Sequence, residues 1–342
     1  MKTVVTFGEV MLRLCPPGYL RLNQTPSLEM TFGGAEANVA VSLANYGINA
    51  RYVTKLPDNP ITDAFEMQMK GFGVDVSYIA KGGDRMGVYF VEKGASMRPS
   101  KVIYDRKYSS IAGAKVGDID WDKVFEGAEW FHWTGITPAL SDSAAELTLE
   151  ACKAAKARGI KISCDLNYRK KLWTREKAKQ VMTELVKYVD VMIANEEDSK
   201  DVFGIAAEGT DIETGKLSEQ GYKDLAKKLS STFGAKKVAF TLRESFSAND
   251  NDWSALIYDA ESDNAVRSRK YSIHIVDRVG GGDSFGGGLI YALLNGYSDA
   301  DAINFAAAAS ALKHTIEGDF NRVSVDEVKS LMGGSASGRV QR

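Results

Sequence analysis

The stretch 277–288 reads Asp277-Arg278-Val279-Gly280-Gly281-Gly282-Asp283-Ser284-Phe285-Gly286-Gly287-Gly288. It follows a strand-like run, 271–276, and precedes a helix-like run, 289–295. Three successive glycines let backbone N–H groups approach a ligand closely, and a helix N-terminus adds unpaired donors and positive potential. The pattern therefore predicts a strand–turn–helix unit whose turn, Gly280–Gly282, binds an anion.

Asp283 follows this turn directly, and its position predicts a catalytic role. A carboxylate beside a bound anion can take the proton of an attacking hydroxyl group. A helix start with Gly for tight packing and Asp as a favourable N-terminal charge is the simpler interpretation. Six glycines lie within residues 280–288, and each costs conformational entropy, so the density of glycines favours an anion site.

A hydrolase motif overlaps the same stretch. Residues 282–286 satisfy G-x-S-x-G, and Ser284, Asp299 or Asp301, and His314 follow the chain order of one class of serine hydrolases. Only 58 residues follow Ser284, and both the acids and the histidine fall on or beside one Ala-rich helical run, 302–312. Side chains from one helix are poorly placed to bring both an acid and the histidine to Ser284. A serine hydrolase therefore remains the distant alternative.

The rest of the chain alternates strand-like and helix-like segments. Strands are expected at 4–7, 130–133, 160–164, 189–194 and 237–241, and helices at 36–46, 61–72, 141–158, 175–188, 195–203 and 221–231. This rhythm is typical of an α/β fold in which a parallel sheet carries helices on both faces.

Two segments, 12–32 and 85–108, break the rhythm because they lack a helical pattern. Their alternating side chains predict a small second sheet that covers one edge of the main domain, and in an enzyme such a sheet would act as a lid that excludes water. A pair of long loops explains the pattern equally well. Residues 332–342 are small and polar, and we expect a flexible tail there.

Composition excludes several classes of protein. The 342 residues carry 43 Lys and Arg against 45 Asp and Glu, and a net charge of −2 argues against a nucleic-acid partner. The three cysteines, Cys15, Cys152 and Cys164, form neither a disulfide framework nor a zinc motif, so we expect a reducing cytoplasm. Charged residues interrupt every apolar stretch before about 18 residues, so no membrane span is expected.

A second glycine pair strengthens the interpretation. Gly33 and Gly34 open a predicted helix, and Asn38 supplies a donor and an acceptor. The segment GGAEANVAVSLANYG (33–47) resembles the first signature of the ribokinase/PfkB family of sugar kinases, and DRVGGGDSFGGGL (277–289) resembles the second. The family fold is a three-layer α/β/α sandwich with a mostly parallel central sheet and a small β-sheet lid. The resemblance extends over residues 1–331.

The resemblance implies a phosphoryl transfer from ATP to a hydroxyl group of a small polyol. Asp283 corresponds to the base, and the N–H groups of Gly280, Gly281 and Gly282 correspond to the anion hole. Mg²⁺ bridges the phosphates in such transfers, and K⁺ near the Asp277 loop is an ion of the family. The implied nucleotide contacts are Asn167, Asn195, Thr241, Arg243, Ser245, Gly280 and Gly282.

Two family motifs are altered in this chain. The Asn-x-x-Glu motif, tied to Mg²⁺ and phosphate, reads Asn195-Glu196-Glu197-Asp198, which leaves Glu197 and Asp198 as candidates for the metal. The nucleotide loop Thr-Leu-Gly-x-x-Gly reads Thr241-Leu242-Arg243-Glu244-Ser245-Phe246. Loss of both glycines is expected to change the backbone conformation near the phosphates of ATP. The side chain of Arg243 either places a cation beside those phosphates or is an exposed surface charge.

The substrate is expected to be a sugar acid. Two arginines, Arg106 and Arg169, are suited to clamp a carboxylate, whereas each alone reads as a surface charge. The positions that resemble substrate contacts of the family's 2-keto-3-deoxygluconate kinases are Gly33, Gly34, Asn38, Tyr89, Tyr104, Arg106, Arg169 and Asp319. The resemblance thus implies 6-phosphorylation of 2-dehydro-3-deoxy-D-gluconate. The alternatives are a fructokinase, another sugar kinase of the family or a non-catalytic sugar sensor, and the lid predicts a homo-oligomer.

Overall fold

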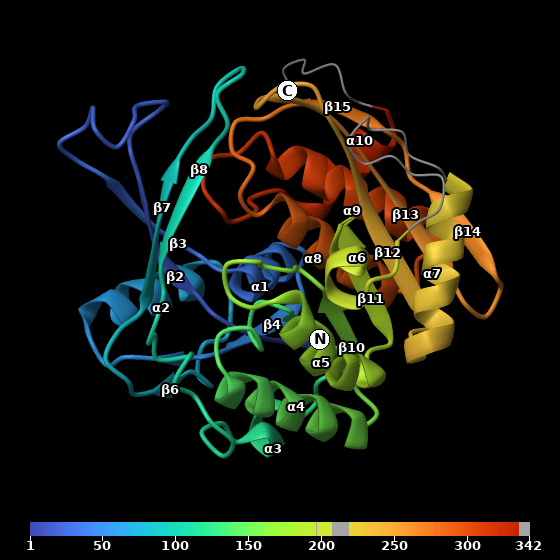
Figure 1. The fold of residues 1–342 in the computed structure, drawn as a ribbon, viewed down its shortest axis with the longest axis horizontal. Coiled ribbons are helices and arrows are strands. Elements are labelled where there is room, and N and C mark those ends of the chain that lie inside the picture. Colours follow the sequence, from blue (N-terminus) through green and yellow to red (C-terminus); the bar gives the residue numbers. More distant parts are fainter. Residues whose placement is uncertain (196, 207–218, 335–342) are drawn as a thin grey trace.

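The computed structural model describes residues 1–195, 197–206 and 219–334. They form a central sheet between two layers of helices, and a smaller sheet stands to one side (Figure 1). Within these residues the central sheet runs in the order β14-β13-β12-β11-β10-β9-β1-β4, and β15 pairs with β13. The strands are β1 (Thr3–Phe7), β4 (Asn49–Val53), β9 (Trp130–Thr134), β10 (Lys161–Asp165), β11 (Val191–Asn195), β12 (Lys237–Ser245), β13 (Asp250–Asp259), β14 (Asn264–Arg267) and β15 (Tyr271–His274). The predicted α/β class is therefore confirmed.

Parallel pairing from β4 to β12 determines where ligands can gather. The pairs β4–β1, β1–β9, β9–β10, β10–β11 and β11–β12 are all parallel, so their carboxyl ends meet at one edge of the sheet. In open α/β sheets ligands bind at this edge. Only the strands after β12 run antiparallel, as a hairpin extension of the sheet.

Two hydrophobic clusters occupy the two faces of the central sheet. One holds α1 (Ala35–Asn45), α2 (Pro60–Gly71), α8 (Gly281–Leu294), α9 (Asp299–Lys313) and α10 (Val325–Met332). The other holds α3 (Trp121–Val124), α4 (Asp142–Ala157), α5 (Arg175–Leu185) with a 3₁₀ turn (Val186–Tyr188), α6 (Asp198–Phe203) and α7 (Glu219–Phe233). Buried Val, Ile and Phe side chains on both sides of each strand explain why these strands read as continuous apolar runs.

Two glycines within α8, Gly287 and Gly288, allow close packing between helices. A Cβ on Gly287 would lie 2.7 Å from Cβ of Ser42 in α1, and one on Gly288 would lie 3.1 Å from Cα of Ala306 in α9. Gly287 and Gly288 therefore let α8 approach its two neighbours closely. Gly287 and Gly288 add to the glycine density that favours an anion site in the sequence, but their own role is packing between helices.

The two helix-poor segments pair as predicted. They supply β2 (Met11–Cys15), β3 (Glu29–Gly33), β7 (Gly87–Glu92) and β8 (Lys101–Asp105), and the small sheet runs β3-β2-β7-β8. In Figure 1 this sheet stands upright beside the carboxyl edge of the central sheet. A separate two-stranded sheet joins β5 (Lys55–Leu56) and β6 (Ala80–Lys81). The expected tail, 332–342, falls mostly outside the described residues.

No helix within the described ranges is long and apolar enough to cross a membrane.

Candidate active site

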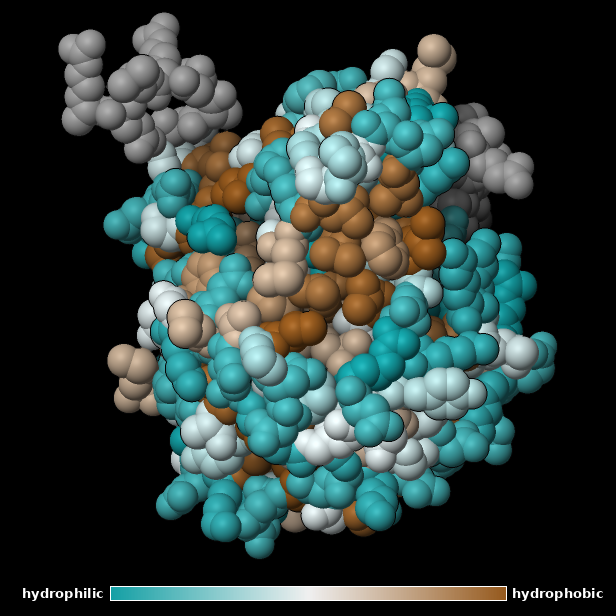
Figure 2. Space-filling model, turned by 90° about the vertical axis from the view of Figure 1, so that its left-hand side faces the viewer, coloured by the Kyte–Doolittle hydropathy of each residue, from teal (hydrophilic) through white to brown (hydrophobic). Residues whose placement is uncertain are grey.

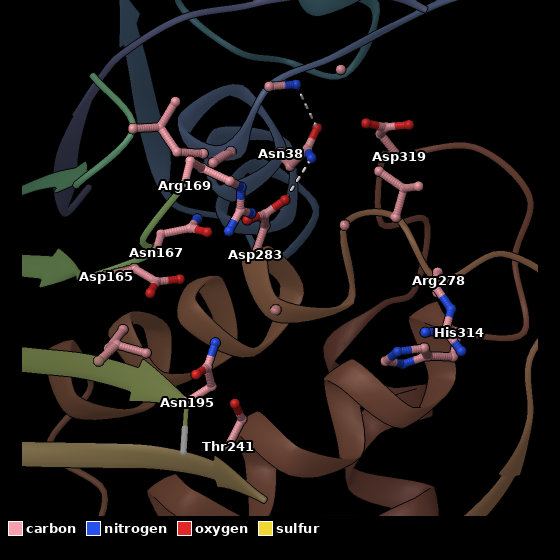
Figure 3. Close-up of a pocket in the computed structure, with 18 of the residues that line it drawn as sticks. Asn38, Asp165, Asn167, Arg169, Asn195, Thr241, Arg278, Asp283, His314 and Asp319 are labelled. Atoms are coloured by element: carbon pink, nitrogen blue, oxygen red, sulfur yellow. Dashed lines mark hydrogen bonds between the residues drawn. The ribbon is translucent and has the colours of Figure 1, made fainter. Parts of the chain in front are cut away.

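A cavity of about 370 Å³ lies between the carboxyl edge of the central sheet and the small sheet. Figure 3 shows polar side chains from several elements pointing into it. The sequence-predicted residues that line it are Gly33, Gly34, Asn38, Tyr89, Tyr104, Arg106, Asn167, Arg169, Asn195, Asp198, Thr241, Arg243, Gly280, Gly282, Asp283 and Asp319. The structure therefore brings together residues that are up to 286 positions apart.

The glycine turn presents backbone donors to this cavity. Gly280 has φ +83°, a left-handed conformation that favours glycine, and a Cβ there would lie 2.1 Å from the carbonyl oxygen of Asp319. Gly281 N–H points back to the carbonyl of Arg278 at 3.3 Å. Within the described residues, no acceptor is found for the N–H groups of Gly280, Gly282 and Asp283. These donors are available to an anion, whereas the predicted donor Gly281 is already engaged.

Asp283 stands in the first turn of α8, at the base of the cavity. Its Oδ2 accepts a hydrogen bond of 2.7 Å from Asn38 Nδ2 in α1 (Figure 3). Removal from bulk water raises the pKa of Asp283 to about 6, and the bond from Asn38 opposes that rise. A carboxyl group with this pKa is ionised at neutral pH and still basic enough to take a proton.

Three arginines bring guanidinium groups to the cavity without a carboxylate oxygen within 4 Å among the described residues. Arg169, Arg243 and Arg278 line it, and none forms an ion pair with any described residue. Each bonds at most to backbone, as Arg169 does to the carbonyl of Tyr168 at 3.1 Å and Arg278 to that of Ala248 at 3.0 Å. Free guanidinium groups in a concave site are suited to carboxylate and phosphate ligands.

Arg106 is held differently. Its Nε donates to Glu9 Oε2 at 2.7 Å, and Ser109 Oγ donates to the other oxygen of Glu9 at 2.8 Å. Both members of this ion pair are buried, and the guanidinium also lies over the ring of Tyr104. Arg106 and Arg169 both line the cavity, but only Arg169 enters it without a carboxylate partner. Glu9 is not among the sequence-predicted site residues.

Asp319 also has internal partners. Its two oxygens accept hydrogen bonds from Arg13 Nη1 and from Tyr89 Oη, each at 2.5 Å. Arg13 also pairs with Asp277 at 2.5 Å, and this guanidinium is only 2% exposed. Burial raises the pKa of Asp319, and the charge of Arg13 opposes the rise. Arg13 thus fixes two loops that border the cavity, a role that its position in an expected lid segment did not reveal.

The two candidates for the metal are separated by the structure. Asp198 accepts hydrogen bonds from backbone N–H groups of Tyr168 and Asn195 at 3.0 and 3.1 Å, so both its oxygens are engaged. Glu197 lies outside the cavity. Across the described ranges no group of three or more His, Cys, Asp or Glu side chains is arranged to hold a metal ion.

Asp165, at the end of β10, lines the cavity and was not among the predicted site residues. Burial, with Asp198 and Asp283 nearby, raises its pKa well above the usual range of a carboxyl group. No ion pair within 4 Å joins it to a described residue. A signal existed in the sequence, because Asp165 opens the polar stretch that follows a predicted strand at the ligand-binding edge.

The altered nucleotide loop is a strand. β12 continues to Ser245 and pairs with β13 through Arg243↔Trp253 and Ser245↔Asn251. Without the two glycines the backbone stays extended, which directs Arg243 to the cavity, whereas Ser245 bonds to Asn251 Oδ1 at 2.8 Å and does not line it. Four further lining residues, Asn251, Trp253, Ile273 and Ile275, come from this hairpin region and were missed.

The three histidines lie in different surroundings. Burial lowers the pKa of His314, which follows α9, to about 4. Its Nδ1 donates to the carbonyl of Ser310 at 2.7 Å, so Nε2 is an acceptor. His274 is exposed, beside Asp250, whereas His132 is buried in the central sheet.

The serine-hydrolase alternative fails on geometry. Ser284 is buried, and its Oγ donates to the carbonyl of Ala309 at 3.2 Å. Asp299 pairs with Lys237 at the opposite end of α9 from His314. At about 1.5 Å per residue, a helix of this length separates the acid from the histidine by roughly 20 Å, so no triad forms.

Comparisons with known proteins agree with this fold and site. Residues 1–322 match the pfkB family of carbohydrate kinases, and the chain belongs to that family. It is 50% identical to the crystal structure of 2-dehydro-3-deoxygluconokinase from Thermotoga maritima, with a TM-score of 0.94 and coverage of 98% of this chain and 100% of that one. The 2-dehydro-3-deoxygalactonokinase of Haloferax volcanii is 33% identical over 98% of both chains. The 2-dehydro-3-deoxygluconokinase of Thermoproteus tenax is 29% identical over 93% of this chain and 90% of its own.

Proposed function

We propose that this carbohydrate kinase transfers the γ-phosphoryl group of ATP to the 6-hydroxyl group of 2-dehydro-3-deoxy-D-gluconate. The observation that carries the proposal is Asp283, an acid with a raised pKa that stands beside free N–H donors at the start of α8. The identity of 50% to the Thermotoga maritima 2-dehydro-3-deoxygluconokinase supports this choice of substrate.

The proposed mechanism assigns each group one task. Asp283 accepts the proton of the attacking hydroxyl, and Asn38 holds the carboxylate in the orientation that faces the cavity. The N–H groups of Gly280 and Gly282 bind the oxygens of the phosphoryl group as charge redistributes. Arg243 and Arg278 contact the remaining phosphates, with Asn167, Asn195 and Thr241 beside them. Positioning and charge stabilisation supply most of the acceleration in such transfers.

A magnesium ion bound with ATP would neutralise part of the charge on the phosphates. The residues present fit such an ion, because Asp165 is a carboxylate in the cavity with no cation paired to it among the described residues. Hard oxygen ligands and a small number of protein contacts are typical of nucleotide-bound Mg²⁺. We therefore assign the metal contact to Asp165, in place of Glu197 and Asp198.

The substrate carboxylate is assigned to Arg169. This guanidinium forms no ion pair within 4 Å among the described residues, whereas Arg106 is paired with Glu9. Tyr104 and the backbone of Gly33 and Gly34 border the same part of the cavity. A neutral sugar would leave Arg169 without a partner, which disfavours a fructokinase.

The test is a panel of acceptors with one matched variant. We expect kcat/KM for 2-dehydro-3-deoxygluconate to exceed that for fructose or ribose by about 10- to 100-fold, since a lost charged hydrogen bond alone costs about 1.5–3 kcal/mol. An Arg169→Met variant is expected to reduce turnover of the acid and leave turnover of fructose unchanged. A wild-type preference for fructose or ribose, or no phosphorylation of any acceptor, would overturn the assignment.

The C4 epimer is a second candidate substrate, favoured by the Haloferax volcanii relative. 2-Dehydro-3-deoxygalactonate has the same carboxylate and the same 6-hydroxyl, so Arg169 and Asp283 serve both acids equally. The same panel separates the two by the ratio of their kcat/KM values. A ratio near one indicates an enzyme that accepts both epimers.

We also propose that two copies associate through the small sheet. The side of this sheet away from the cavity carries an apolar row, Met30–Leu14–Phe90–Ile103, in which Met30 and Ile103 are more than half exposed. Figure 2 shows hydrophobic side chains gathered on this side of the molecule. Ile103→Lys is expected to yield a monomer in light scattering, whereas Val116→Lys, at an exposed site outside the sheet, leaves the assembly intact. A wild-type monomer would contradict this proposal.

The expected cytoplasmic location stays a proposal. All three cysteines are free and buried, which is suited to a reducing compartment. With a net charge of −2, the chain is proposed to act on small anions without a nucleic-acid or membrane partner. Fractionation of cells that produce it tests the location, and recovery with membranes would contradict it.

A further inference from the structure

Lys313, the last residue of α9, buries its ammonium group completely. The Nζ atom donates to two backbone carbonyl oxygens, that of Asp277 at 3.4 Å and that of Ile316 at 3.2 Å. No carboxylate lies within 4 Å of it in the described residues. A lysine is almost never fully buried without a paired carboxylate, so this position calls for a specific explanation.

The side chain of Lys313 packs against the anion-binding turn. A Cβ on Gly280 would lie 3.3 Å from Cε of Lys313, so the side chain packs against the turn itself. Asp277 begins the loop that leads into Gly280, and Ile316 belongs to the loop that follows α9. Lys313 therefore links two loops through their carbonyl oxygens and supports Gly280.

The two buried carboxylates that pair with Arg13 are matched by two cations of the chain, without an added ion. Asp277 and Asp319 are two buried carboxylates, and Arg13 pairs with both. Arg13 and Lys313 supply two positive charges to this cluster. Burial lowers the pKa of Lys313, and the charges of Asp277, Asp319 and Asp283 oppose that change.

This arrangement does not fit the K⁺ ion that the family resemblance implies near Asp277. Backbone carbonyl oxygens are the ligands that such an ion uses, and here two of them already accept hydrogen bonds from an ammonium group. We propose that Lys313 replaces an exchangeable monovalent cation and holds the glycine turn in the conformation that presents its free N–H groups. The inference rests on the proposed kinase function of the same turn.

The first test uses the wild-type protein in different salts. Activity is measured in tetramethylammonium chloride, which is too large for a carbonyl cage, and then with added KCl or NH₄Cl at constant ionic strength. Because the cation is part of the chain, we expect the wild-type rate in tetramethylammonium chloride to agree within about twofold with the rates in KCl and NH₄Cl. A tenfold difference between salts would correspond to about 1.4 kcal/mol of cation-dependent stabilisation. A wild-type enzyme that needs K⁺ for activity would overturn the proposal.

Two variants of Lys313 then separate charge from shape. Lys313→Met keeps the length of the side chain and removes its charge, and it leaves no room for an ion. Lys313→Ala removes both and opens a space beside the carbonyl oxygens. We expect each to lower kcat by about 10- to 100-fold in tetramethylammonium chloride, as a misplaced oxyanion donor does. K⁺ or NH₄⁺ is expected to restore most of the activity to Lys313→Ala alone.

A thermal-unfolding measurement supplies a readout that does not depend on catalysis. K⁺ is expected to raise the unfolding temperature of Lys313→Ala by about 2–4 °C relative to tetramethylammonium, and not to raise that of the wild type. Lys237→Met is the matched control, since Lys237 is a partly buried lysine paired with Asp259 and Asp299 at the far end of β12. It is expected to lose stability but to gain no response to K⁺.

The outcomes distinguish this inference from the proposed function. If the wild type phosphorylates no acceptor, the kinase proposal fails, and the unfolding temperatures still test whether a cation occupies the space of Lys313. If Lys313→Ala folds but neither its activity nor its unfolding temperature responds to K⁺ or NH₄⁺, the replacement of a cation is refuted.

Discussion

Two helices of this molecule begin at glycines beside the same cavity, α1 at Gly34 and α8 at Gly280. Gly34 is in extended backbone, and its N–H is directed to Asn38 Oδ1 of the same helix at 3.4 Å. Gly280 is left-handed, and its N–H has no acceptor among the described residues. Both glycines permit a close approach of backbone, but of these two N-cap residues only Gly280 has its own N–H free for a ligand.

The acids in the two first turns differ in the same way. Glu36 in α1 is 1% exposed, and one of its oxygens accepts bonds from Thr134 N, Thr134 Oγ1 and Thr137 Oγ1. Asp283 in α8 has one side-chain partner, Asn38, and faces the cavity. Burial raises the pKa of Glu36 to about 7 and that of Asp283 to about 6. A raised pKa therefore does not identify the reactive acid; access to a ligand does.

The largest expected effect follows from Asp283→Asn. An amide of the same shape keeps a contact with Asn38 but accepts no proton, so we expect kcat to fall by about 10²–10⁴-fold. The KM for ATP is expected to change little. Steady-state kinetics on the sugar acid measure both quantities.

Asp63→Asn is the control for this variant, because Asp63 lies in the first turn of α2 and outside the cavity. It is expected to keep wild-type kinetics. Activity of Asp283→Asn within tenfold of wild type would contradict the assignment of the base.

A smaller effect is expected from the glycine turn, where two substitutions separate strain from obstruction. Gly280→Ala places a Cβ 2.1 Å from the carbonyl of Asp319 at φ +83°, so we expect a loss of about 1–3 kcal/mol in stability and about 100-fold in kcat. Gly282→Ala meets no described atom within 4 Å and is expected to fold normally. Its methyl group occupies the anion site, so activity alone declines.

Chemical denaturation and kinetics on both glycine variants test this distinction. Equal losses of stability in the two proteins would show that Gly280 is not specially constrained by the backbone.

Substitution of Asn38 by alanine is expected to change the pH dependence of the reaction. The base must be ionised, so kcat/KM of the wild type should fall as the pH decreases through about 6. The bond from Asn38 stabilises the carboxylate and lowers the pKa of Asp283. In Asn38→Ala the pKa rises, and the acidic limb of the kcat/KM profile moves to higher pH. An unchanged limb would show that another group controls it.

The sequence predicted the alternation of strands and helices because each parallel strand reads as a short apolar run between helices with polar faces. Ser141 illustrates a local signal that was sufficient: it accepts a bond from Ala144 N and begins α4 as expected. The continuation of β12 to Ser245 was not predicted, since it depends on pairing with β13 across a hairpin. Cross-strand contacts decide such boundaries more than local preference does.

The site also has one part that local sequence predicts and another part that depends on tertiary contacts. The donors of the glycine turn and the position of Asp283 follow from local sequence, because one turn builds them. The partners of Arg13 and Arg106 do not, because each lies in a distant segment, as with Arg13 and Asp319, 306 residues apart. Sequence patterns locate charged side chains at the site, and only the tertiary structure shows which of them are already neutralised.

The last prediction concerns Glu36 and stability rather than catalysis. A folded pKa of about 7, above the usual value of 4.5, means that the folded state binds more protons than the unfolded state between these values. The contribution of Glu36 to stability therefore declines as the pH rises from about 4.5 to 7. Glu36→Gln resembles the protonated acid and does not titrate. The free energy of unfolding of this variant, relative to wild type, should thus increase by about 1–3 kcal/mol between pH 5 and pH 8.

Urea denaturation of both proteins at pH 5 and pH 8 measures that difference, and the titration of Asp283 cancels because both proteins contain it. The kcat of Glu36→Gln is expected to stay within about twofold of wild type, since Glu36 bonds to Thr134 and Thr137 and does not line the cavity. A difference in stability that does not change with pH would show that Glu36 ionises as readily in the folded protein as in the unfolded chain. In that case the contrast between the two acids would rest on access to the cavity alone.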